Sequence, residues 1–94
     1  MAITVKFVGA LRQATGAEKL SVDIAEGFSI RRLMDELLRR APELKRSLIN
    51  QKVDNAGLNA LVLVNGREIS VLGGLDAMVK DGDEVVFVPV VHGG

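Results

Sequence analysis

The chain has no cysteine, a single histidine and no excess of charge of either sign. Without cysteine it can form no disulfide, thiolate nucleophile or zinc–cysteine site. With His92 alone, a two-histidine metal site is excluded, and a Ser-His-Asp triad would have to use that residue. Twelve basic side chains balance twelve acidic ones, so nothing points to binding of nucleic acid or an anionic membrane.

Long apolar runs are also absent. No stretch reaches the roughly 18 apolar residues of a membrane-spanning helix, and the first residues lack the basic region and long apolar core of a signal peptide. We therefore expect a soluble, cytoplasmic protein. With 94 residues, of which 48% are hydrophobic, the chain can form one small domain with a modest core.

Alternating apolar residues predict β-strands. Ile3, Val5 and Phe7 alternate with Thr4, Lys6 and Val8, which is the period of a strand with Lys6 on its outer face. Asn65-Gly66 is the dipeptide that best suits a type I′ hairpin turn. The predicted strands cover residues 3–8, 19–24, 60–64, 67–69 and 85–91.

One main helix is predicted to begin after Ser29, whose hydroxyl can cap the unpaired N–H groups of the first turn. Phe28 and Leu33 have the spacing of a hydrophobic staple, and Pro42 ends the helix. Four pairs of opposite charges four residues apart favour a solvated outer face. They are Arg31 with Asp35, Arg32 with Glu36, Asp35 with Arg39, and Glu36 with Arg40. The apolar stripe comprises Ile30, Leu33, Met34, Leu37, Leu38 and Ala41.

This order of elements predicts an α+β fold, the β-grasp (ubiquitin-like) roll. We expect a mixed sheet of four to five strands with one main helix packed across one face. The first and last strands are the most apolar, so they should lie side by side at the centre. Residues 1–89 would form the β-grasp domain and residues 90–94 a projecting tail.

The helix can cover only one face of this sheet. The phase of the strands predicts that apolar side chains also occupy the uncovered face, where a contiguous patch usually marks a partner surface. Isolated surface apolar residues, which are common, are the alternative. The predicted patch consists of Val8, Leu61, Leu63, Val86 and Val88.

The last strand leads to a diglycine end. Pro89 has no N–H to donate, so pairing should weaken there and the chain should leave the sheet in extended form. A frayed tail is the alternative. Without a Cβ, glycine can approach other groups closely, and a terminal carboxylate becomes reactive once AMP is transferred to it from ATP. The tail residues are Val90, Val91, His92, Gly93 and Gly94.

Residues 80–94 carry an acidic-Gly-Asp-Glu turn, an apolar strand, a proline and a terminal diglycine. With the opening strand and turn at residues 5–16 and the hairpin at residues 63–66, the whole chain resembles the ubiquitin-like sulfur carriers. It looks most like the small subunit of molybdopterin synthase and the small archaeal modifier proteins.

The resemblance implies that an E1-like enzyme uses ATP to adenylate Gly94, and that a sulfur donor then converts this end to a thiocarboxylate. In molybdopterin synthesis the tail enters the large synthase subunit, which transfers sulfur to a pterin precursor. The carrier is a protein co-substrate rather than an enzyme, and binds no cofactor or metal itself.

Two departures from the family pattern leave the pathway open. Val90 follows Pro89, where many molybdopterin carriers have a second proline. The segment between the helix and the central hairpin, residues 42–59, is also longer than in the family. Molybdenum or tungsten cofactor synthesis, tRNA thiolation and thiamine synthesis are all compatible with the sequence. A protein modifier conjugated to lysines of target proteins is the alternative to a carrier, and a plain binding module that does not need Gly93-Gly94 is a third hypothesis.

Overall fold

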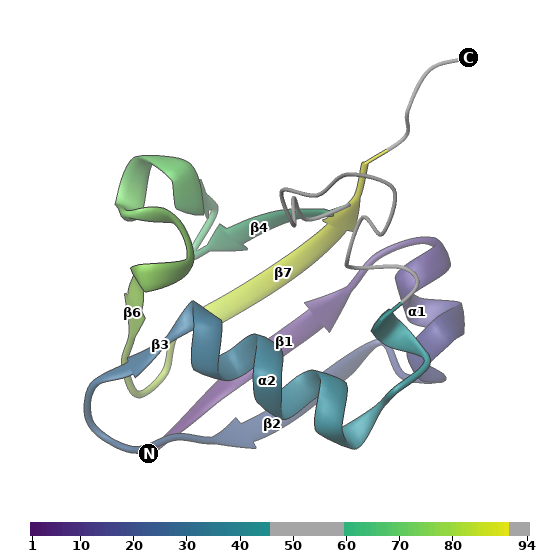
Figure 1. The fold of residues 1–94 in the computed structure, drawn as a ribbon, viewed down its shortest axis with the longest axis horizontal. Helices are drawn as coiled ribbons and strands as arrows, with labels where there is room; N and C mark the ends of the chain where they lie inside the picture. Colours follow the sequence, from purple (N-terminus) through teal and green to yellow (C-terminus); the bar gives the residue numbers. More distant parts are fainter. Residues whose placement is uncertain (46–59, 91–94) are drawn as a thin grey trace.

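A computed structural model describes residues 1–45 and 60–90 of the chain. In this part a five-stranded mixed sheet curves around one main helix, which lies across one of its faces (Figure 1). The predicted β-grasp roll is confirmed. The strands follow the order β2-β1-β7-β4-β5, with bounds β1 Ala2–Phe7, β2 Lys19–Asp23, β4 Ala60–Val64, β5 Arg67–Glu68 and β7 Glu84–Pro89.

The first and last strands lie side by side at the centre of the sheet, as the sequence predicts. β1 and β7 are parallel, and their register pairs Phe7 with Phe87. The two rings stack with centroids 5.8 Å apart and planes 18° apart. All other pairs in this sheet are antiparallel. Central strands are shielded from water by their neighbours, so the most apolar segments of the chain occupy these positions.

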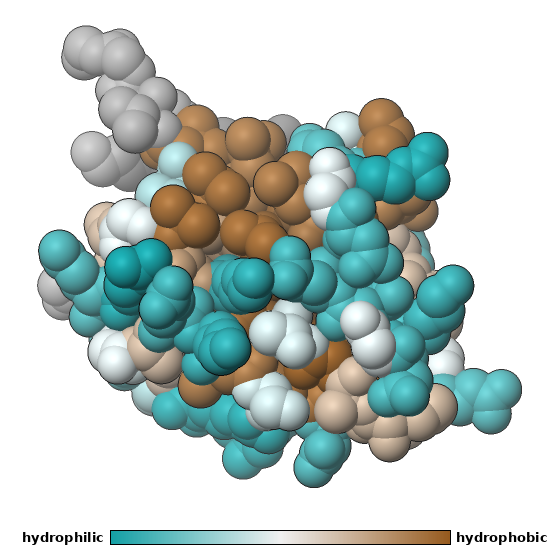
Figure 2. Space-filling view, turned by 180° about the vertical axis from the view of Figure 1, so that it is seen from behind, coloured by the Kyte–Doolittle hydropathy of each residue, from teal (hydrophilic) through white to brown (hydrophobic). Residues whose placement is uncertain are grey.

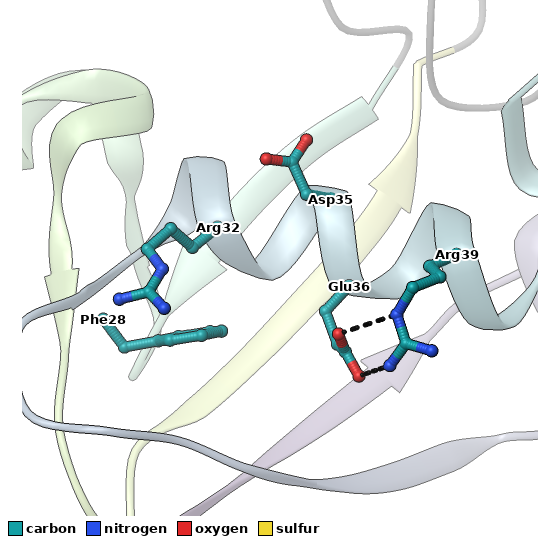
Figure 3. Close-up of a pocket in the computed structure, with 5 residues that line it drawn as sticks. All are labelled: Phe28, Arg32, Asp35, Glu36 and Arg39. Carbon is teal, nitrogen blue, oxygen red and sulfur yellow. Dashed lines mark hydrogen bonds and ion pairs between the residues drawn. The ribbon is translucent and has the colours of Figure 1, made fainter.

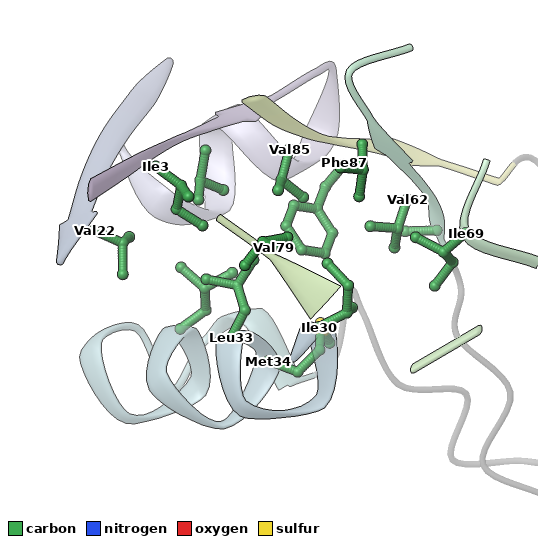
Figure 4. Packing of buried hydrophobic residues seen from close by; sticks show 14 of the residues in the cluster. Ile3, Val22, Ile30, Leu33, Met34, Val62, Ile69, Val79, Val85 and Phe87 are labelled. Carbon is green, nitrogen blue, oxygen red and sulfur yellow. The ribbon is translucent and has the colours of Figure 1, made fainter. Parts of the chain in front are cut away.

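The main helix, α2, spans Ile30–Arg40 and begins as predicted. The Ser29 hydroxyl accepts a hydrogen bond from the N–H of Arg32 at 3.2 Å, and the helix stops two residues before Pro42. Its apolar stripe packs against the inner face of the sheet, toward which Ile30 and Leu33 point (Figure 4). Ile30, Leu33 and Leu37 are fully buried. This stripe and the inward side chains of β1 and β7 form the core.

The charges on the outer face of α2 pair differently from the prediction. Of the four predicted pairs, the structure contains the one between Glu36 and Arg40, at 3.0 Å. Arg39 also bonds to Glu36, and Arg31 instead reaches Asp76, at 3.2 Å. Hydrogen bonds from Arg39 and Arg40 hold the pKa of the Glu36 carboxyl below its ordinary value.

Several short elements are not predicted from the sequence. Helix α1, Ala10–Thr15, fills a segment for which the sequence predicts a turn only at its end, at Thr15-Gly16. A small second sheet pairs β3, Phe28–Ser29, with β6, Met78–Val79. The return strand β5 is shorter than expected, because Ile69 is buried at the start of a 3₁₀ turn. The two 3₁₀ turns are η1, Ile69–Leu72, and η2, Gly74–Asp76.

Candidate functional site

Five apolar side chains lie together on the face of the sheet that α2 leaves uncovered. The register places Leu61 opposite Val88 and Leu63 opposite Val86, and directly opposed residues share a face. Val8 directly follows β1, and its N–H donates to Phe87 O, so it lies next to the end of β7. Figure 2 shows apolar side chains gathered in one area of this face, with polar ones around it. The apolar patch is Val8, Leu61, Leu63, Val86 and Val88.

The side chains of the apolar patch differ in exposure. Val8 is 41% exposed and Leu61 45% exposed, whereas Leu63, Val86 and Val88 are half-buried. The structure thus brings together all five residues that the sequence singled out for this face. Their role as a partner surface stays a prediction.

A polar half of the same sheet face borders the apolar patch. Lys6 Nζ lies 2.9 Å from Glu84 Oε2, and both side chains are 44% exposed. Lys6 is the register partner of Val86, so the ion pair meets the patch directly. The apolar half lies where β7 ends, and the polar half where it begins.

The point where the chain leaves the sheet lies beside the apolar patch. Val8 N donates to Phe87 O at 3.1 Å, one residue beyond the last register pair of β1 and β7, which joins Phe7 and Phe87. On the other side β7 stays paired for two more residues, up to Ala60 opposite Pro89. Val90, 37% exposed, is the last described residue. The predicted tail residues Val91, His92, Gly93 and Gly94 lie outside the described residues.

The acidic residues of the turn before β7 accept backbone hydrogen bonds, as expected for turn formers rather than paired catalytic acids. Asp81 Oδ1 accepts from the N–H of Ala2 at 2.8 Å, and Asp83 Oδ2 from the N–H of Lys80 at 2.9 Å. Within residues 1–45 and 60–90, no three His, Cys, Asp or Glu side chains cluster in a way that could hold a metal ion.

A shallow hollow of about 250 Å³ lies on the opposite side of the molecule, between α2 and β3 (Figure 3). The Arg32 guanidinium covers the Phe28 ring at 5.1 Å from its centroid, and Arg39 bonds to Glu36. Asp35 completes the lining. These charged groups contact one another or solvent, as expected for the solvated outer face of α2.

Gly9 is not among the residues that the sequence analysis singles out, and the structure places it beside the site. Its backbone has φ +61° and ψ −131°, and a Cβ added there would lie 3.4 Å from Pro89 Cγ. The available signal is a glycine directly between a strand and a run of good helix formers, Ala10-Leu11-Arg12.

Comparison with known proteins agrees with this arrangement. The chain matches the ThiS family over residues 5–94, which include the second half of β1, the other four strands of the main sheet, the apolar patch and Gly93-Gly94. It belongs to the ThiS family. The resemblance to ubiquitin-like sulfur carriers is thereby confirmed at the level of the family.

Individual members of this group are similar along their whole length. The chain is 31% identical to ubiquitin-related modifier 1 homolog 1 of Arabidopsis thaliana, and the match covers all of both chains. Small archaeal modifier protein 1 of Methanosarcina acetivorans is 30% identical, with a TM-score of 0.80 over 99% of this chain and 96% of the other. A proposed molybdopterin converting factor, subunit 1, of Pyrococcus furiosus is 27% identical, with a TM-score of 0.78 over 97% and 99%.

The chain therefore has the ubiquitin-like fold that ThiS-type carriers share with ubiquitin-related and archaeal modifiers. In the part of this ThiS-family chain that the structure describes, no helix has both the length and the apolar character needed to cross a bilayer.

Proposed function

We propose that this protein is a ubiquitin-like sulfur carrier whose reacting group is the carboxylate of Gly94. The observation that carries the proposal is the position of the apolar patch, on an uncovered sheet face beside the exit of the last strand, in a chain that matches the ThiS family through to residue 94. Residues 1–89 act as the folded domain that partners bind, and residues 90–94 as the tail that carries the reacting group.

In the proposed reaction the chain is a co-substrate, and a partner supplies the catalytic groups and the ATP. An E1-like enzyme transfers AMP from ATP to the Gly94 carboxylate, which releases pyrophosphate. A sulfide-level nucleophile then attacks the acyl carbon and expels AMP, so that a thiocarboxylate remains. Gly93 and Gly94 suit a narrow channel because they carry no side chain.

The apolar patch supplies the affinity in this scheme. Val8 and Leu61 have unshielded apolar surface that a partner can bury, at roughly 25 cal/mol for each Å² removed from water. The Lys6–Glu84 pair at its border can fix the orientation of the partner through charge, which contributes more to specificity than to affinity.

For the sulfur acceptor we propose the synthesis of molybdopterin in the cytoplasm, with the large subunit of a molybdopterin synthase as the second partner. The likeness to the Pyrococcus furiosus protein, which is named for molybdopterin conversion, supports this pathway.

A second candidate is a protein modifier, in which the amine of a lysine on a target protein displaces AMP or sulfur and forms an isopeptide bond with Gly94. The relatives from Arabidopsis thaliana and Methanosarcina acetivorans favour it, because both are named as modifiers. Both candidates use the same patch and the same tail.

The experiment that tests the proposal is ATP–pyrophosphate exchange with the E1-like enzyme of the same organism. We expect exchange with the wild-type chain, and none after deletion of Gly94 or fusion of one alanine behind it, with unchanged melting temperatures. The matched control is an alanine fused before Met1, which is 60% exposed, and it should exchange normally. Wild-type exchange with the C-terminal fusion would refute the proposal.

Mass spectrometry of the protein from its native cells separates the two candidates. A mass gain equal to the exchange of one oxygen for sulfur supports the carrier. Adducts with whole target proteins, joined at lysines, support the modifier.

A further inference from the structure

Pro89 ends the ladder between the two central strands at a defined position. Val8 N donates to Phe87 O, and in a parallel ladder the next β7 donor facing β1 would be residue 89. Proline has no N–H, so this side of β7 is released while the other side stays paired with Ala60. The ring also fixes the φ of Pro89 and keeps Val88 extended.

The released side of Pro89 is not empty, because Gly9 packs against it. Gly9 has a φ of +61°, which L-residues with a side chain rarely adopt, and its backbone turns away from β1 into α1. A Cβ at this position would lie 3.4 Å from Cγ and 4.0 Å from Cδ of the Pro89 ring. The Pro89 ring therefore lies next to the Gly9 backbone, without a side chain between them.

The backbone of Gly9 is itself held firmly. Leu11 N donates to Val8 O at 3.3 Å and Arg12 N donates to Gly9 O at 3.0 Å, which closes the turn into α1. The Leu11 side chain is completely buried and anchors α1 to the core. These hydrogen bonds and the buried Leu11 side chain tie the backbone next to Pro89 to the core.

From this geometry we propose that Gly9 and Pro89 are positioning residues that aim the C-terminal segment during adenylation, an inference that rests on the proposed function. Pro89 restricts its own φ and the conformation of Val88, at the start of the tail. The Gly9 backbone sterically limits the positions of the Pro89 ring on the side of β1. The partner enzyme then has fewer conformations to order before the terminal carboxylate meets ATP.

The test compares Gly9→Ala and Pro89→Ala with Gly16→Ala in the ATP–pyrophosphate exchange assay. Gly16 is the matched control, since it also has a positive φ, +71°, but nothing lies within 4 Å of an added Cβ. We expect Gly9→Ala and Pro89→Ala to lower kcat by about 5- to 30-fold, the factor for ordering roughly one backbone residue. Their KM should stay close to the wild-type value, because the apolar patch is intact.

Gly16→Ala should lose melting temperature but keep its kcat. Since Gly9→Ala is strained, Pro89→Ala keeps the test valid if the first variant does not fold. As a second readout, the NMR order parameter of the Val90 amide should fall in Pro89→Ala and stay unchanged in Gly16→Ala.

A wild-type kcat in Pro89→Ala, or an equal loss of kcat in all folded variants, would overturn this inference and leave the proposed function standing. Absence of exchange with the wild-type chain would instead refute the proposed function.

Discussion

The side-chain amide of Asn65 donates a hydrogen bond to Oδ1 of Asp83, 2.9 Å away and 18 residues further along the chain. Asn65 Oδ1 in turn accepts from the N–H of Glu84 at 2.9 Å. Asp83 is only 7% exposed, and its second carboxylate oxygen bonds to the N–H of Lys80. These bonds join the β4–β5 hairpin to the turn before β7, and so fix the start of the strand that carries the tail.

Removal of this junction should destabilise the fold. We expect Asp83→Ala to lower the free energy of unfolding by about 1–3 kcal/mol, because it removes the acceptor of two partly buried hydrogen bonds, from the Asn65 amide and the N–H of Lys80. Asn65→Gly breaks the same bond but keeps a residue suited to the φ of +51° at that position, so its loss should be smaller. Urea denaturation measures both losses. The control is Asp76→Ala, at an exposed residue, whose loss of unfolding free energy should stay below about 0.5 kcal/mol.

Partner binding should depend on the apolar patch and not on exposed apolar surface in general. Leu61→Asp should raise the KM of the activating enzyme for this chain at least tenfold, which corresponds to roughly 1.4 kcal/mol. Its melting temperature should change little, since Leu61 is 45% exposed. Val71→Asp is the matched control on η1, 72% exposed and outside the patch. Equal effects of the two variants would show that the patch is not the docking surface.

Neighbouring valines on β7 should separate folding from binding. Val85 is fully buried and Val86 half-buried on the other face. Val85→Ala should cost about 1.5–3 kcal/mol of unfolding free energy through lost burial and a cavity, with unchanged partner affinity. Val86→Ala should cost less than about 1 kcal/mol but weaken binding. The reverse order in urea denaturation would mean that the two faces are assigned wrongly.

The Glu36 carboxyl should titrate below its ordinary pKa of 4.5, because Arg39 and Arg40 bond to its charged form. A carboxyl whose folded pKa is lowered adds stability above the unfolded pKa, and this contribution fades as the pH falls through the folded value. The stability difference between wild type and Glu36→Gln should therefore shrink in acid. NMR titration checks the shift directly, and Arg40→Gln should bring the pKa back toward the ordinary value.

Local signals were sufficient where the cause of a structure lies within a few residues. Ser29 predicts the start of α2 through its own hydroxyl, and Asn65-Gly66 predicts its turn because both residues accept a positive φ. The alternation along β4 and β7 likewise places Leu61, Leu63, Val86 and Val88 on one face, since side chains of a strand alternate strictly.

Short elements and long-range contacts were not predictable in this way. α1 has six residues and buries only Leu11, so it carries no measurable period. Arg31 pairs with Asp76 instead of Asp35 because the fold brings η2 beside α2. The fold also holds the two-residue strands β3 and β6 together.

The sequence by itself determined the β-grasp roll and the inward and outward phase of its main strands. Those features follow from local propensity and periodicity. Only the tertiary structure decided that Gly9 lies under Pro89 and that Asp83 reaches Asn65. Such contacts depend on the register between strands far apart in the chain, which is set when the whole core packs.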